Sequence, residues 1–178
     1  PEIMSDEQIT KEFGKKYIIA KSRMSVKLEC EIIINSVGNE GVDRVVSRIS
    51  KVRPGLKIAI GLNIGKGRET PLEKATDDYL YCLEKGYPEA DFFTINISSP
   101  NTPGLRTLQG DAYLSQLLKE LQRRSDELSK KFLIPKRPLF VKLSPDLSDE
   151  ELLKVIDSCK QHQISGIVAT NTTTDYSL

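Results

Sequence analysis

The sequence predicts an α/β fold built on parallel strands, and three observations indicate it. Short apolar runs alternate with segments whose apolar residues have helical spacing. The runs are nearly continuous in hydrophobic residues, which is typical of parallel strands covered on both faces. A helix follows a strand four times before a fifth strand begins, and this order favours right-handed crossover connections within one sheet.

The predicted strands are the apolar runs at residues 32–34, 56–62, 92–97, 139–143 and 164–169. The apolar positions that predict four helices are Val42, Val45, Val46 and Ile49; Ala75, Tyr79, Leu80 and Leu83; Leu114, Leu117, Leu118 and Leu121; and Leu152, Val155, Ile156 and Cys159. Residues 1–30 lack a comparable pattern, although Phe13 and the run at 17–19 indicate an edge element.

Two of these helices carry sequence signals at their start. Thr70 and Glu73 have the spacing of a capping box, and Pro71 stands at the first helical position, so a helix is predicted to begin there. Ser148 and Glu151 repeat the spacing ahead of the last helix.

Composition excludes several classes of protein. The chain has 178 residues, of which 38% are hydrophobic and 29% charged, so a packed core is expected rather than disorder. Lys+Arg 26 against Asp+Glu 25 gives a net charge of +1, which argues against nucleic-acid binding through a broad basic surface. No apolar run approaches the roughly 20 residues that cross a bilayer, and no signal peptide is expected.

The cysteines and the single histidine offer little for metal binding or histidine-based catalysis. Cys30, Cys82 and Cys159 form no Cys-x-x-Cys pair, so they are predicted to be reduced, buried thiols rather than disulfides or zinc ligands. His162 lies in a polar stretch and is predicted to be a solvated residue at a helix end. We expect no metal site.

Polar residues stand at the carboxyl end of every predicted strand. They are Asn35, Asn63, Asn96, Lys142, Thr170 and Asn171. In parallel α/β folds the carboxyl ends of the strands form one rim, and chemistry is located there. Asparagine amides both donate and accept hydrogen bonds, so they could bind a planar ring ligand with alternating N–H and C=O groups. The lysine could lie beside a negative charge that develops on such a ligand.

Each strand-end residue also has a purely structural interpretation. An asparagine after a strand often makes the turn and caps the next helix. Lys142 could be a surface lysine on an edge strand, although Phe140, Val141 and Leu143 around it indicate a buried strand. The loop at 96–106 carries two prolines and Gly104, which predict one fixed shape suited either to a catalytic loop or to a rigid turn.

Five motifs of the chain together resemble class 2 dihydroorotate dehydrogenases. The motifs are INISSPNTPGLRTLQ at 95–109, GLNIGK at 61–66, DDYLYCLEK at 77–85, FVKLSPDLSDEEL at 140–152 and GIVATNTT at 166–173. They occur in the order of the family, and the resemblance covers residues 32–176. Ser99 stands where class 1 relatives have cysteine, which indicates the quinone-dependent class.

This resemblance implies an FMN-dependent enzyme with the fold of the (β/α)8 TIM barrel family. Such enzymes oxidise dihydroorotate to orotate in pyrimidine biosynthesis and pass the electrons to a quinone. They are associated with the bacterial cytoplasmic membrane or the mitochondrial inner membrane. The chain would represent about five βα units, as a single partial barrel domain over residues 1–178 in which residues 31–178 carry the strands and helices.

The same matching implies roles for individual residues. Ser99 resembles the catalytic base, and because serine is a poor base at neutral pH it must relay its proton through neighbours or water. Lys142 resembles the lysine that faces the flavin and favours its anionic reduced form. The residues that match FMN contacts are Asn63, Asn96, Lys142 and Thr170. The residues that match substrate contacts are Asn35, Asn96, Asn101, Asn171 and Thr172.

The chain also departs from the family pattern. Ser36 replaces the usual arginine, and residues 38–41 shorten the family's Gly-Phe-Asn-Asn-x-Gly segment. The early Ala-Gly-x-Asp-Lys segment, the glycine-rich loops for the FMN phosphate and the amphipathic membrane helices do not appear. We therefore expect an internal segment of the enzyme that is inactive alone and binds FMN weakly or not at all. The alternative is a non-catalytic, flavin-free barrel fragment that acts as a binding or assembly partner.

Overall fold

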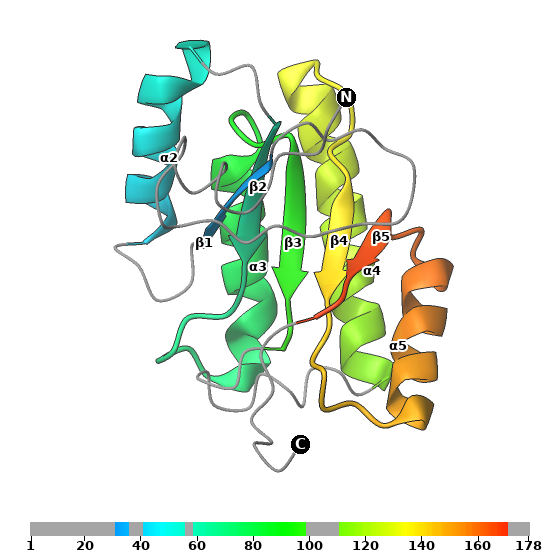
Figure 1. Ribbon diagram of the computed structural model, residues 1–178. Coiled ribbons are helices and arrows are strands. Elements are labelled where there is room, and N and C mark those ends of the chain that lie inside the picture. Colours follow the sequence, from blue (N-terminus) through cyan, green and yellow to red (C-terminus); the bar gives the residue numbers. More distant parts are fainter. Residues whose placement is uncertain (1–30, 36–40, 56–58, 99–110, 171–178) are drawn as a thin grey trace, which may run out of the picture.

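The computed structural model describes residues 31–35, 41–55, 59–98 and 111–170, which form a parallel β-sheet flanked by helices (Figure 1). Within these residues five strands pair in chain order, each parallel to the next. The strands are β1 (Glu31–Asn35), β2 (Ala59–Ile64), β3 (Phe92–Asn96), β4 (Leu139–Lys142) and β5 (Gly166–Val168). The helices are α2 (Val42–Val52), α3 (Ala75–Gly86), α4 (Asp111–Phe132) and α5 (Asp149–Gln161), with 3-10 turns η1 (Arg53–Gly55) and η2 (Leu72–Lys74). The predicted α/β class and the predicted order of strands and helices are confirmed.

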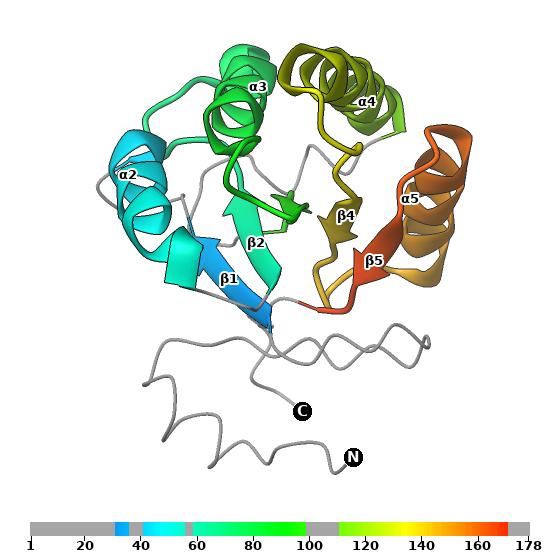
Figure 2. The same cartoon turned by 90° about the horizontal axis from the view of Figure 1, so that it is seen from above.

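The sheet is curved, and α2, α3, α4 and α5 lie along its outer side (Figure 2). All of the described helices thus lie on one side of the sheet (Figure 2). A TIM barrel has this arrangement, with helices outside and side chains filling the space enclosed by the strands. The strands read as continuous apolar runs because their inner face also buries hydrophobic side chains.

Alternate residues of each strand point to opposite faces of the sheet. The outward side chains of β2, β3 and β4 pack against the helices in one hydrophobic core. These strand residues are Ile60, Leu62, Ile64, Phe93, Ile95, Leu139 and Val141. The residues between them point to the concave inner face, where the candidate site lies.

Two aromatic rings fill the inner face toward the amino ends of the strands. Phe92 and Phe140 meet edge to face with their centroids 5.7 Å apart. Glycines make room for them: a Cβ atom on Gly61 would lie 2.0 Å from the Phe92 ring, and one on Gly166 would lie 3.0 Å from the Phe140 ring. Large and small residues thus alternate across this face, as in the packed layers of a barrel interior.

The four helices predicted from apolar spacing are all present. Of the two predicted helix starts, the one at Ser148 is confirmed and the one at Thr70 is wrong. Ser148 and Glu151 form the predicted reciprocal capping box of α5. Thr70 caps no helix, because η2 intervenes and α3 begins at Ala75. The physical reason is a side-chain hydrogen bond from four residues earlier in the chain, since the Thr70 carbonyl accepts from Lys66 Nζ at 2.5 Å.

The cysteine prediction is confirmed where it can be checked. Cys82 and Cys159 are buried free thiols, and burial raises the pKa of the Cys159 thiol to about 11, so it stays protonated. Cys30 lies outside the described residues. His162 does end a helix, as the C-cap of α5, but it is half-buried rather than fully solvated, because its Nε2 lies 2.7 Å from Ser115 Oγ on α4.

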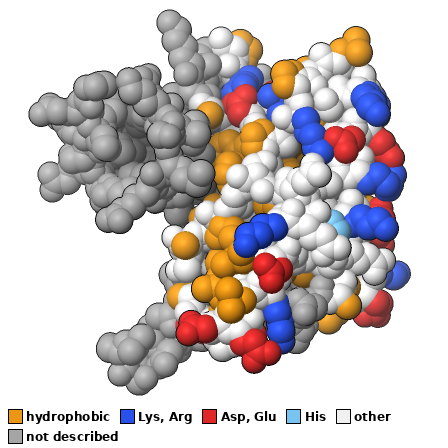
Figure 3. Space-filling view, turned by 90° about the vertical axis from the view of Figure 1, so that its right-hand side faces the viewer, with side chains coloured by type: hydrophobic (Ala, Val, Ile, Leu, Met, Phe, Trp, Pro, Cys, Tyr) orange, Lys and Arg blue, Asp and Glu red, His pale blue; other side chains and the backbone are white. Residues whose placement is uncertain are grey.

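The strands β1 and β5 form the two edges of the described sheet. On the side of α5, hydrophobic side chains gather next to residues that are not described, while charged side chains cover the outer helices (Figure 3). Ile167 of β5 and Leu153 of α5 are among the exposed hydrophobic residues. No helix in the described ranges is long and apolar enough to span a membrane.

Asp91, just before β3, connects several elements at the amino end of the sheet. Its carboxylate accepts two hydrogen bonds from Arg53, at 2.6 and 2.7 Å, and one from the Ile60 backbone N–H at 2.8 Å. Arg137, ahead of β4, lies 3.8 Å from the same carboxylate. Burial alone would raise the pKa of Asp91, but the Arg53 and Ile60 hydrogen bonds and the nearby arginine charges outweigh it and lower the pKa.

Replacing Asp91 by asparagine should lower the free energy of unfolding of the full-length protein by about 1–3 kcal/mol, because it removes the negative charge that accepts hydrogen bonds from Arg53 and from the Ile60 N–H. Since the folded pKa lies below the unfolded value of about 3.9, this stabilisation is complete above that pH and is lost as the pH falls through the folded pKa. Urea unfolding between pH 3 and 7 measures both effects.

The matched control for Asp91 is Glu127→Gln, which removes the exposed ion pairs of Glu127 with Arg123 and Arg124 on α4. This variant should leave the free energy of unfolding nearly unchanged, because exposed pairs contribute little. Equal losses in the two variants would contradict the role given to Asp91.

Candidate functional site

The candidate site lies on the inner face of the sheet at the carboxyl ends of β2, β3 and β4. Asn96 and Lys142 are the last residues of β3 and β4 and pair across the two strands. Asn63, near the end of β2, pairs with Thr94 of β3. Paired residues of neighbouring strands point to the same face, so all of these side chains share the inner face. All of them are buried, and the structure thus brings together three of the predicted site residues.

Lys142 is a buried cation for which no described residue provides an ion pair or a hydrogen bond. Only 8% of the residue is exposed, and desolvation lowers the pKa of its ammonium group. Its neighbours on the inner face are the neutral Asn96 and the hydrophobic Val168. A desolvated lysine in such surroundings favours a ligand that carries or develops negative charge.

Asn96 is held in place from two sides. Its Oδ1 accepts hydrogen bonds from the backbone N–H of Ser98 at 3.2 Å and from the Ser98 hydroxyl at 3.1 Å. Its backbone carbonyl accepts a hydrogen bond from the Tyr79 hydroxyl at 2.8 Å. With its oxygen engaged by Ser98, the amide offers its NH2 group as a donor to a ligand.

Lys66 is a second buried lysine near the rim, but its ammonium group is used within the protein. It is 2% exposed and donates to the carbonyl oxygens of Gly67 at 2.9 Å and Thr70 at 2.5 Å. Asp78 Oδ2 accepts from the Gly67 N–H at 2.7 Å, so two side chains fasten the loop between β2 and α3. Sequence reasoning assigned no role to Lys66, Ser98 or Tyr79. Lys66 and Ser98 bond to residues close in sequence, but no recognised motif signals these contacts. Tyr79 bonds to a strand end in another element, which depends on the tertiary structure.

The other predicted site residues are placed only in part. Asn35 is the last residue of β1 and pairs with Asn63, so it belongs to the same rim. Thr170 follows β5 by two residues and is exposed. The remaining predicted residues, Ser99, Asn101, Asn171 and Thr172, lie outside the described residues, and their roles stay predictions.

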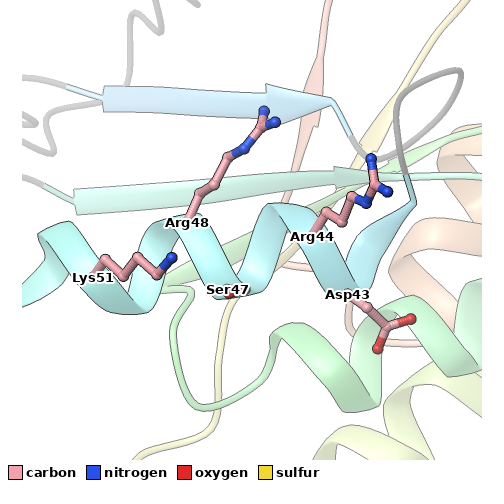
Figure 4. Close-up of a pocket in the computed structure, with 5 residues that line it drawn as sticks. All are labelled: Asp43, Arg44, Ser47, Arg48 and Lys51. Atoms are coloured by element: carbon pink, nitrogen blue, oxygen red, sulfur yellow. The ribbon is translucent and has the colours of Figure 1, made fainter.

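A separate hollow of about 420 Å³ lies on the outer helix layer beside α2. It is lined by Asp43, Arg44, Ser47, Arg48 and Lys51. Arg44 and Arg48 extend to the same side of α2, whereas Asp43 points away (Figure 4). This open, basic surface is not part of the strand-end rim, because all of its lining residues belong to one outer helix.

Comparison with known proteins agrees with the fold. The chain belongs to the dihydroorotate dehydrogenase family, whose model matches residues 20–178. It is 48% identical over 157 residues to a dihydroorotate dehydrogenase (quinone) of Photorhabdus laumondii and 46% identical over 160 residues to one of Aliivibrio salmonicida. These matches cover 87% and 89% of the chain but 46% and 47% of the relatives, so the chain spans about half their length.

A solved structure gives the same result. The crystal structure of DHODH in complex with ferulenol from Eimeria tenella superposes with a TM-score of 0.69 at 32% identity, covering 76% of this chain and 41% of the other. The predicted resemblance to the quinone-dependent class and the predicted barrel family are therefore confirmed. The alternative of a non-catalytic binding partner is not favoured, because the relatives carry the name of the enzyme.

Proposed function

We propose that the full-length protein containing this chain is an FMN-dependent dihydroorotate dehydrogenase that passes electrons to a quinone. The observation that carries this proposal is the buried, desolvated Lys142 beside Asn96 at the strand ends of a chain of this family. Dihydroorotate and orotate are the proposed substrate and product, and the reaction belongs to pyrimidine biosynthesis. Association with a membrane would involve parts of the protein outside this chain.

The described residues fit the ring system of a flavin. Lys142 supplies a desolvated positive charge, and the Thr94 hydroxyl is buried without a hydrogen-bond partner in the described part of the chain. Phe92 and Phe140 fill the inner face next to these groups and exclude water. FMN, when bound, would supply the acceptor for the hydride that leaves the substrate.

We assign the following roles to this chain's residues. Asn63, Asn96, Lys142 and Thr170 would hold the flavin, and Lys142 would stabilise negative charge that develops on the ring during reduction. Asn35, Asn96, Asn101, Asn171 and Thr172 would hold the pyrimidine ring by hydrogen bonds that match its alternating N–H and C=O groups. Ser99 would remove the proton from the ring carbon next to the carbon that loses the hydride.

The test of the proposed function is an activity assay on the full-length protein. We expect purified protein with a flavin absorption band to convert dihydroorotate to orotate when a quinone is added, with one quinone reduced for each orotate formed. Protein without flavin, or flavoprotein that forms no orotate with any quinone, would overturn the proposal.

A further inference from the structure

Tyr79 connects the outer helix layer to the rim of the candidate site. It belongs to α3 and is completely buried. Its hydroxyl donates a hydrogen bond to the backbone carbonyl of Asn96, with 2.8 Å between the oxygens. One phenol group thus joins α3 to the carboxyl end of β3.

The position of this hydroxyl along the strands is informative. The last pair of the ladder between β2 and β3 is Ile64 with Ile95. Asn96 is the next residue of β3. The Tyr79 hydroxyl therefore holds the β3 backbone just past the point where β3 stops pairing with β2. Without it, the Asn96 carbonyl would lose a buried hydrogen-bond partner, which is costly.

We propose that Tyr79 is a positioning residue, whose hydroxyl holds the end of β3 against α3 and so aims the Asn96 amide at the bound ring. The inference rests on the proposed function. Ser98 fixes the Oδ1 end of the Asn96 side chain, and Tyr79 fixes its backbone. Displacements of about 1 Å at a site of this kind can cost up to about 100-fold in rate.

Tyr87 provides a matched control within the same part of the fold. It is also completely buried, and it follows α3 as its C-cap. Its hydroxyl donates to the Ser125 carbonyl at 2.8 Å and accepts from the Arg137 N–H at 3.2 Å. Arg137 precedes β4, so Tyr87 makes equivalent backbone hydrogen bonds at the end of the sheet opposite to the candidate site.

The experiment compares Tyr79→Phe with Tyr87→Phe in the full-length flavoprotein. Both variants lose one buried hydroxyl, so their melting temperatures should fall by similar amounts. Only Tyr79→Phe should lower kcat, by about 10-fold to 100-fold, and weaken binding of orotate and FMN several-fold. Orotate binding is measured by the change in flavin absorption, and FMN binding by titration of the flavin-free protein.

Equal kcat values and equal dissociation constants in the two variants would overturn the proposal. If the unmodified protein does not oxidise dihydroorotate, the proposed function fails, and the comparison of FMN affinities between the two variants still decides on Tyr79.

Discussion

Replacing Ser99 by alanine in the full-length protein should lower kcat for dihydroorotate oxidation by about 10²–10⁴-fold, the usual contribution of a general base. FMN should remain bound, because the residues assigned to the flavin are different ones. The loss should appear in the rate of flavin reduction by dihydroorotate, measured by stopped-flow absorption. Reoxidation of the reduced flavin by quinone should be unchanged, because it does not involve the substrate proton.

The control for Ser99 is Ser98, the preceding residue in the sequence, whose hydroxyl donates to Asn96 Oδ1. Ser98→Ala should slow flavin reduction by about tenfold or less, because the backbone N–H of Ser98 still holds Asn96. Near-normal turnover of Ser99→Ala with FMN bound would contradict the assignment of the base.

Replacing Lys142 by methionine should have opposite effects on activity and stability. Flavin reduction should slow by about 10²–10³-fold, since a preorganised charge beside the reacting ring is lost. The flavin-free protein should become more stable by about 1 kcal/mol, because a desolvated ammonium group gives way to an apolar side chain of similar length. Stopped-flow reduction and urea unfolding of the flavin-free variant measure the two effects.

Lys66→Met is the matched control for this variant, since Lys66 is the other buried lysine of the rim. Its ammonium group donates to two backbone carbonyls, so its removal should destabilise the protein by about 1–3 kcal/mol. The two lysines thus differ in the sign of their effect on stability. If Lys142→Met destabilises the flavin-free protein, the buried Lys142 charge does not lower the stability of the ligand-free fold, and its proposed role in binding a ligand is contradicted.

Much of the fold follows from local sequence signals. The apolar spacing of Leu114, Leu117, Leu118 and Leu121 predicts α4, and all four side chains are buried. The capping box at Ser148 predicts the start of α5 because its hydrogen bonds form within four consecutive residues. The same signal at Thr70 is wrong, because the Lys66 side chain takes up the Thr70 carbonyl and no local pattern reveals that contact.

Some features of the candidate site likewise follow from the sequence, and others depend on the tertiary structure. The sequence by itself determined the family, the strand-end positions of Asn63, Asn96 and Lys142, and the alternation that puts them on one face, because these depend on motifs and on the period of a strand. Only the tertiary structure decided that Lys142 is desolvated and that Tyr79 reaches Asn96. Both features depend on contacts between separate elements of the chain, whose geometry is fixed by packing rather than by local pattern.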